Sequence, residues 1–283
     1  MEQQKMNVEP EVSSESVIPQ ERVAALLGRG FELRQSGNMD EATAKLEQAL
    51  AEARATPYEI EFQTRIQLAM TLADVYQSLG QIQKACAMLV DEAAFAEKIS
   101  QIMQATGTPP QKRAATSGYL QVRDRSTQMS LLGQEAPEIS VKEWIKGGPA
   151  SLADFSGRVV LLEFWATWCK PCQEMFPKLK KLYEHERSRG LEVIALTRHY
   201  MAYRGPAESM TEERQLMLNM VTEHGVDFHV GIAEDERLQG IYGANGLPTV
   251  VLIDRNGIIR YAGPGEDDMT FNKQLQQSLE LRA

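Results

Sequence analysis

The sequence has few cysteines, no long apolar run and no excess of basic residues. Its 283 residues include only Cys86, Cys169 and Cys172, too few for the disulfide framework of a secreted scaffold. No run of about 18 apolar residues occurs, so no membrane-spanning helix is predicted. The net charge of −9 argues against a nucleic-acid or anionic-membrane partner. Protein partners fit this composition better.

The N-terminal segment also lacks an apolar signal core before Gln20. We therefore expect a cytoplasmic protein, with an exported one as the alternative if a signal has been removed. Residues 1–20 are rich in Ser, Glu, Pro and Gln. Because this composition buries too little apolar surface to offset its ordering entropy, we expect a flexible tail.

Residues 21–132 have a helical periodicity and repeat themselves at an offset of 43 residues. Small residues match small ones and large match large, in the pairs Gly30/Ala73, Leu33/Tyr76, Gly37/Gly80, Ala42/Ala85, Leu46/Leu89 and Ala53/Ala96. The segments 33–42 and 76–85 resemble the centre of tetratricopeptide repeats, whose usual period is about 34 residues. We expect an all-α helical-repeat domain that binds a protein partner, capped by a helix or helix pair over about 110–131. A dimerisation or spacer role is the alternative.

Residues 133–283 have a different pattern, typical of an α/β domain. The apolar runs 159–165 and 191–196 indicate strands buried on both faces. Residues 249–254 and 258–261 flank a Gly-containing turn and predict a hairpin. A closing helix is expected over about 268–281.

The pair Cys169 and Cys172 follows the first of these strands directly. This placement puts Cys169 at the N-terminus of the next helix, where unpaired backbone N–H groups and the helix dipole stabilise a thiolate. Lys170 adds a positive charge, and Pro171 is tolerated in the first turn. We expect a lowered Cys169 pKa, with Cys172 attacking the mixed disulfide that Cys169 forms. A zinc site would need four ligands that the sequence does not supply, so we expect no metal and no cofactor.

Several motifs in this half resemble the TlpA and ResA group of thioredoxin-like thiol-disulfide oxidoreductases. They are Ala136-Pro137, the run from Ser151 to Cys172, Pro177 and Gly246-Leu-Pro-Thr249. The resemblance covers about residues 133–283. It implies a thioredoxin-like α/β fold and electron exchange with a disulfide-containing protein substrate, with an upstream thiol donor that restores the dithiol.

The resemblance also implies roles for individual residues. Leu247 and Pro248 match a loop that carries a cis-proline facing the cysteines, where the Leu247 backbone would pair with the substrate. Glu163 matches a buried acid that relays the proton of the second cysteine, although a strand-edge carboxylate in solvent is the alternative. Trp168 is expected to form an apolar wall for the substrate, whereas Trp165 is expected in the core.

Two other functions are kept as alternatives. A peroxiredoxin-like peroxidase shares the fold, but its proline and threonine would stand where Leu162 and Ala166 occur. A repeat-type adaptor would use the thioredoxin-like domain only as a scaffold, which the intact cysteine pair argues against. If the compartment is reducing, the pair should act as a reductase.

Overall fold

The computed structural model describes residues 18–148, 151–200, 209–265 and 269–281. The chain divides into two compact units, Met1–Val75 and Tyr76–Ala283. The boundary expected near residue 132 stays a prediction. Most of the expected flexible tail lies outside the described residues, and its last two residues, Pro19 and Gln20, are helical.

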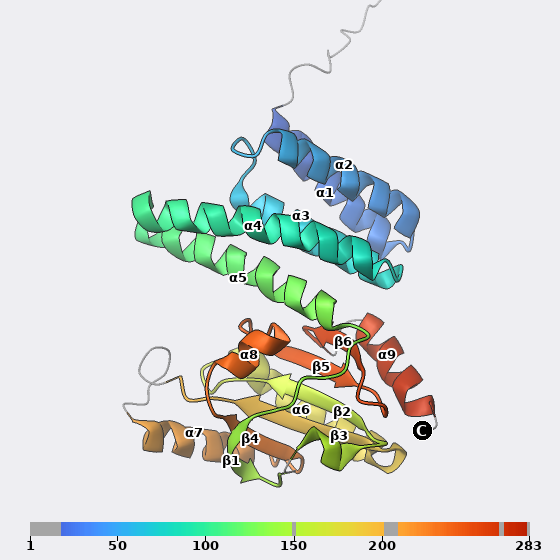
Figure 1. The fold of residues 1–283 in the computed structure, drawn as a ribbon, viewed down its shortest axis with the longest axis vertical. Helices are drawn as coiled ribbons and strands as arrows, with labels where there is room; N and C mark the ends of the chain where they lie inside the picture. The colour runs from blue at the N-terminus through green and yellow to red at the C-terminus, as the bar shows by residue number, and fades with distance from the viewer. Residues whose placement is uncertain (1–17, 149–150, 201–208, 266–268, 282–283) are drawn as a thin grey trace, which may run out of the picture. The chain divides into compact units, whose positions relative to one another are not determined.

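The N-terminal region is all-helical, as predicted (Figure 1). Its helices are α1 (Pro19–Gln35), α2 (Met39–Ala55), α3 (Phe62–Ser78), α4 (Ile82–Thr106) and α5 (Pro109–Leu131). Helix α5 is one continuous helix over almost the range expected for the cap. Whether α1–α4 are tetratricopeptide repeats stays a prediction.

The repeated positions have the backbone that their glycines favour. Gly37 and Gly80 both take the left-handed conformation, with φ of 81° and 70°. The amide of Asn38 donates to the carbonyl of Leu33 over 2.9 Å, and the equivalent bond 43 residues later measures 2.8 Å. Each first helix of a repeat therefore ends in the same way.

Helices α1 and α2 pack through the small residue that the repeat pattern marks. A Cβ added at Gly30 would lie 2.6 Å from the side chain of Leu46, which is fully buried. The glycine therefore lets the two helices approach closely.

Among the described residues of the C-terminal unit, six strands form one mixed sheet in the order β1-β4-β3-β2-β5-β6. The strands are β1 (Val141–Lys146), β2 (Val159–Phe164), β3 (Leu191–Thr197), β4 (His229–Ala233), β5 (Thr249–Ile253) and β6 (Ile259–Gly263). Strands β2, β3 and β4 are parallel, whereas β5 runs antiparallel to β2 and β6 to β5. The predicted α/β fold and the predicted hairpin are confirmed.

Alternate residues of β2 point to opposite faces of this sheet. Leu161 belongs to a buried cluster with Phe176 of α6 (Lys170–Glu186) and Leu275 of α9 (Met269–Glu280). Leu162 belongs to a second cluster with Tyr242 of α8 (Arg237–Tyr242). Helix α7 (Met210–Glu223) contributes to the first cluster. The sequence analysis did not identify β1, β4, α7 and α8, whose apolar patterns are short or broken by polar residues.

Helix α5 packs against both α4 and the sheet region. Its C-terminal half carries buried polar side chains that reach the sheet region. Arg125 donates to the carbonyl of Ala262 in β6 over 3.0 Å, and Gln128 donates to the carbonyl of Gly243 over 2.7 Å. These bonds tie the helix to β6 and to the segment that follows α8.

Candidate functional site

Cys169 and Cys172 form a disulfide at the N-terminus of α6, with their Cα atoms 5.3 Å apart. Cys169 is the N-cap residue, and its Sγ accepts a hydrogen bond from the amide of Cys172 over 3.3 Å. Cys169 is 4% exposed and Cys172 is fully buried. The more exposed residue of the pair is therefore the one at the helix terminus, and its role as the attacking cysteine stays a prediction.

The two residues between the cysteines lie in the first turn of α6 and are exposed. Pro171 has no N–H to lose where the helix provides no acceptor. The Lys170 ammonium and the helix dipole both favour negative charge on the Cys169 sulfur once the disulfide is reduced. Their effect on reactivity stays a prediction.

Glu163 lies one residue before the end of the central strand β2, opposite Ala195 of β3 and Val250 of β5. Its side chain is fully buried, and neither carboxylate oxygen has a hydrogen-bond partner among the described residues. Burial raises the pKa of Glu163 well above its ordinary value. By strand alternation it shares the sheet face that carries Leu161 and the two cysteines. The alternative of a solvent-facing carboxylate at a strand edge is wrong.

The two tryptophans before the cysteines differ as expected. Trp165 is fully buried and packs edge-on against Phe176 at 4.9 Å between ring centroids. Trp168 is half-buried and packs edge-on against Tyr200 at 5.2 Å. The backbone amide of Tyr200 donates to Glu213 over 2.9 Å, which fixes the ring behind Trp168. Sequence reasoning missed this support because Glu213 lies on a helix that it did not identify.

The peptide bond between Leu247 and Pro248 is cis, as the resemblance implies. The hydroxyl of Thr249 donates to the carbonyl of Gly246 over 2.6 Å and closes the turn. Leu247 and Trp168 both pack against the buried cluster that contains the two cysteines, and both line one cavity. The structure thus brings together residues that lie about 80 positions apart in sequence.

Cys86 is the remaining cysteine and is unpaired. It is half-buried, on α4 between a buried position and an exposed one. Burial raises the pKa of its thiol, which disfavours the reactive thiolate. Cys86 therefore serves as a reference for a cysteine outside the site.

The described residues contain neither a candidate metal-binding group nor a candidate membrane-spanning helix. Within the described ranges, no group of three or more His, Cys, Asp or Glu side chains could hold a metal ion. No described helix is long and apolar enough to cross a membrane.

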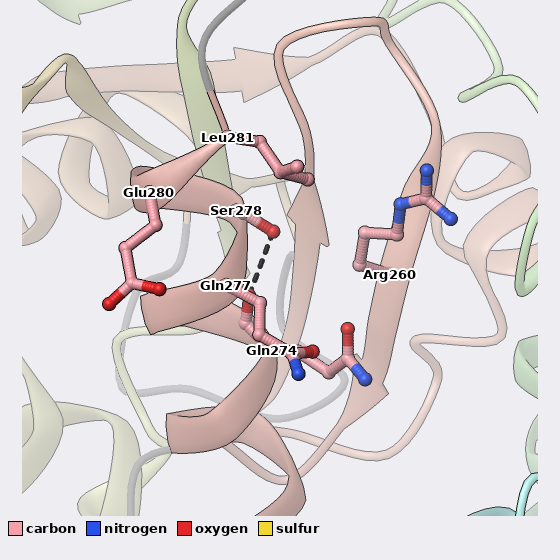
Figure 2. Close-up of a pocket in the computed structure, with 6 residues that line it drawn as sticks. All are labelled: Arg260, Gln274, Gln277, Ser278, Glu280 and Leu281. Atoms are coloured by element: carbon pink, nitrogen blue, oxygen red, sulfur yellow. Dashed lines mark hydrogen bonds between the residues drawn. The ribbon is translucent and has the colours of Figure 1, made fainter.

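A pocket of about 470 Å³ lies between β6 and α9 (Figure 2). The Ser278 hydroxyl within it donates to the carbonyl of Gln274 in its own helix over 2.8 Å. The described residues that line it include neither cysteine and no residue of the cis-proline loop. We assign it no role in the chemistry.

Sequence comparison relates this chain to known oxidoreductases. The Redoxin family model matches residues 131–278. The thiol-disulfide oxidoreductase ResA of Bacillus thuringiensis (strain Al Hakam) is 35% identical over 126 residues, which are 44% of this chain and 65% of that protein. ResA of Bacillus thuringiensis subsp. konkukian (strain 97-27) is 32% identical over 53% of this chain and 77% of that protein. The chain thus covers 65% of the length of the first of these relatives.

Solved structures similar to this chain include one described as a putative thiol:disulfide interchange protein DsbE from Chlorobium tepidum. It is 26% identical to this chain, and the match covers 52% of this chain and 97% of the solved one, with a TM-score of 0.43. Helices α1–α4 and nearly all of α5 precede the range that the Redoxin family matches.

Proposed function

This chain belongs to the Redoxin family, and from that membership we propose that Cys169 and Cys172 exchange electrons with disulfides of other proteins. The observation that carries the proposal is the pair itself: two cysteines joined as a disulfide at a helix N-terminus, with the first sulfur accepting a helix amide. Glu163 is buried on the sheet face that carries this pair, and Trp168 and Leu247 pack against the cluster that contains the two cysteines.

The first chemical step uses the reduced pair. The Cys169 thiolate attacks one sulfur of the substrate disulfide and forms a mixed disulfide with it. The substrate's other sulfur leaves as a thiolate and takes a proton from water. The N-terminus of α6 and Lys170 favour the thiolate form that this step needs. Trp168 and Leu247 shield the reacting sulfurs from water on one side.

The second step closes the disulfide that the structure contains. Cys172 transfers its thiol proton to the Glu163 carboxylate, directly or through one water, and attacks the Cys169 sulfur. The substrate's second thiolate leaves, so the substrate gains two electrons and the pair loses two. The raised pKa of Glu163 makes it a stronger base than an exposed carboxylate. An upstream dithiol donor then reverses the exchange and restores Cys169 and Cys172.

The direction of electron flow follows from the reduction potential of the pair. We propose a reductase, as expected for a reducing compartment. A glutathione titration should then give a potential nearer to about −270 mV than to about −120 mV, the range between thioredoxin and a strong oxidant. A value at the oxidising end would reverse the proposed direction and leave the exchange chemistry in place.

We also propose that helices α1–α4 bind a protein partner. Phe31 and Tyr58 support this, because these aromatic side chains are 45% and 72% exposed on a region with a repeated helical pattern. Replacing both with Ser in the full chain should abolish binding of a co-purified partner and leave insulin reduction unchanged. Retained binding would contradict the proposal.

Trapping of a mixed disulfide tests the exchange mechanism. The Cys172→Ser variant keeps the attacking sulfur and should accumulate a mixed disulfide with native, disulfide-bonded insulin or another disulfide protein. The Cys169→Ser variant should trap none. Neither variant should accelerate the reduction of insulin by dithiothreitol. Mass spectrometry of the trapped species identifies the cysteine involved.

Cys86→Ser is the matched control, because it makes the same substitution at a half-buried, unpaired cysteine. It should keep the full rate of insulin reduction. Equal trapping by the two site variants would sink the assignment of Cys169 as the attacking residue.

A further inference from the structure

A cavity of about 670 Å³ lies beside the cysteine site and has one wall that the Redoxin family does not supply. Trp168 and Leu247 form the wall next to the cysteines. The opposite wall comes from α5 and from Gln104 near the end of α4. All of these residues belong to the compact unit Tyr76–Ala283. A molecule bound in this cavity would therefore contact α5 as well as Trp168 and Leu247.

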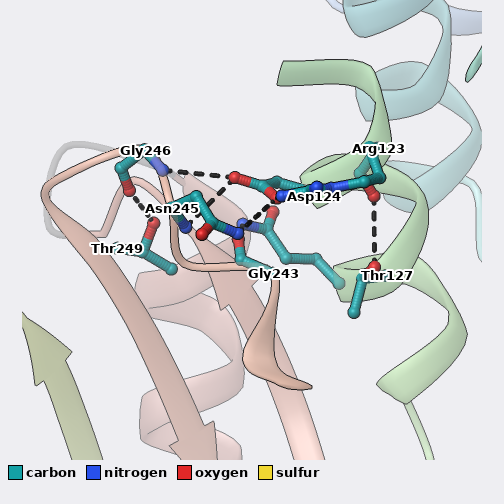
Figure 3. A network of polar contacts seen from close by, with 8 residues as sticks. Arg123, Asp124, Thr127, Gly243, Asn245, Gly246 and Thr249 are labelled. Atoms are coloured by element: carbon teal, nitrogen blue, oxygen red, sulfur yellow. Dashed lines mark hydrogen bonds and ion pairs between the residues drawn. The ribbon is translucent and has the colours of Figure 1, made fainter. Parts of the chain in front are cut away.

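Asp124 of α5 holds the loop that leads to the cis-proline (Figure 3). One carboxylate oxygen accepts hydrogen bonds from the amides of Asn245 and Gly246 over 3.1 and 3.2 Å. The other accepts from the side-chain amide of Asn245 over 2.9 Å. Asp124 is 5% exposed, so these bonds satisfy a charge that burial would otherwise penalise. The α5 wall and Leu247 are thereby held at a fixed spacing.

The rest of the α5 wall is cationic and polar. Besides Asp124, the lining residues of α5 recur every three or four positions and share one helix face: Lys112, Arg113, Thr116, Ser117, Leu120 and Gln121. Within the described part of the chain, no hydrogen bond or ion pair engages the side chain of Lys112 or Arg113. The carboxylate of Asp124 is already engaged. The free charge of this wall is therefore positive on a chain whose net charge is −9.

We propose that this cavity binds the polypeptide segment next to the substrate's disulfide and selects segments with an acidic side chain at the α5 end. The proposal rests on the proposed function and names the substrate class for that site. Leu120 and Lys112 are eight positions apart on α5, about 12 Å at the rise of a helix. An extended chain covers that length in about four residues. A peptide whose cysteine lies level with Leu120 would thus place its acidic residue at Lys112 about four residues away.

Peptides with one cysteine in a mixed disulfide with thionitrobenzoate test this selectivity, because its release is coloured. Each carries Glu, Gln or Lys four residues to one side or the other of the cysteine. With the reduced full chain at low salt, the Glu peptide of the favoured side should show a kcat/KM about fivefold above its Lys counterpart, as expected for one partly exposed ion pair. Raising the ionic strength should remove the difference.

Two double variants with the same change in net charge test whether the α5 wall causes the preference for the Glu peptide. Lys112→Glu with Arg113→Glu should abolish or reverse the preference for the Glu peptide. Lys98→Glu with Lys181→Glu changes two exposed lysines that do not line the cavity and should keep the preference. Equal kcat/KM for the Glu and Lys peptides, or a preference that survives the first double variant, would overturn the proposal. A failure of the proposed function would give a different result. In that case the full chain would release thionitrobenzoate from every peptide no faster than the Cys169→Ser variant does.

Discussion

Two regions of the C-terminal unit each bury a carboxylate, and they treat it in opposite ways. In the centre of the sheet, Glu163 is fully buried and has no hydrogen-bond partner among the described residues. At the contact between α5 and the loop 243–246, Asp124 is 5% exposed and accepts four hydrogen bonds, three from the loop and one from Arg123. The first region leaves the cost of burial uncompensated, whereas the second offsets it.

The difference fits the proposed chemical role of Glu163 and the proposed positioning role of Asp124. A buried charge without partners costs free energy and shifts its pKa, which suits a group that must take up a proton. A buried charge with four donors has a fixed geometry, which suits a group that holds a loop. Removing each carboxylate by mutation and comparing the effects on rate, KM and stability tests this interpretation.

The largest expected effect is on the rate of exchange when the unpartnered carboxylate is removed. Glu163→Gln keeps the size of the side chain but cannot accept the proton of Cys172. The rate of insulin reduction near neutral pH should fall by up to about 10²-fold, the low end for a positioned base. The pH profile of the rate should lose the step that Glu163 contributes. An unchanged profile would leave Glu163 without a part in proton transfer.

The next effect is a loss of substrate affinity and stability when the partnered carboxylate is removed. Asp124→Ala removes the charged acceptor of the part-buried hydrogen bonds from Asn245 and Gly246, which should cost about 1–3 kcal/mol of stability. The KM for peptide substrates should rise while kcat for a small disulfide stays constant, since the cysteines are untouched. Asp124→Asn keeps an acceptor oxygen and should restore most of the KM. Equal KM for the Ala variant and wild type would contradict a positioning role.

A smaller effect is expected where α5 meets the backbone of the loop. Gly243 has φ of 62°, and an added Cβ would lie 2.5 Å from the carbonyl oxygen of Asp124. Gly243→Ala should cost the left-handed strain of about 1–2 kcal/mol plus the displacement of α5, and should raise the KM.

Gly37→Ala is its matched control, because φ is 81° there and an added Cβ meets nothing within 4 Å. It should show the left-handed cost alone and leave the KM unchanged. Calorimetric unfolding of both variants measures the difference. Equal losses of stability would show that α5 tolerates the added Cβ.

The smallest effect concerns stability against pH and returns to Glu163. Its folded-state pKa is raised above the ordinary value of 4.5, so the unfolded chain ionises first. The free energy of unfolding should therefore fall as pH rises from about 4.5 through the folded-state pKa, and Glu163→Gln should remove this fall. All three tryptophans lie between Trp144 and Trp168, so tryptophan fluorescence in urea follows this unit. A steeper fall in the variant would reverse the sign of the argument.

Predictability from sequence differed between local and long-range features. The helix after the cysteines, the hairpin at residues 249–261 and the glycine turns of the repeats were predictable because each depends on neighbouring residues. Strands β1 and β4 were not identified, since five or six residues with polar interruptions carry little periodicity. Arg125 and Gln128 gave no sign of burial, because their acceptors, Ala262 and Gly243, lie more than 100 positions away.

The sequence by itself determined where the proposed thiol–disulfide exchange takes place. A cysteine pair that follows a buried strand, with Lys and Pro between the cysteines, comes to lie at a helix N-terminus through local geometry alone. The tertiary structure alone decided what surrounds that pair. Sheet pairing buried Glu163 between Ala195 and Val250. Packing of α5 brought Asp124 to the cis-proline loop, 121 positions along the chain. Hydrogen bonds and burial depend on distance in space, and the order of residues fixes that distance only within one element.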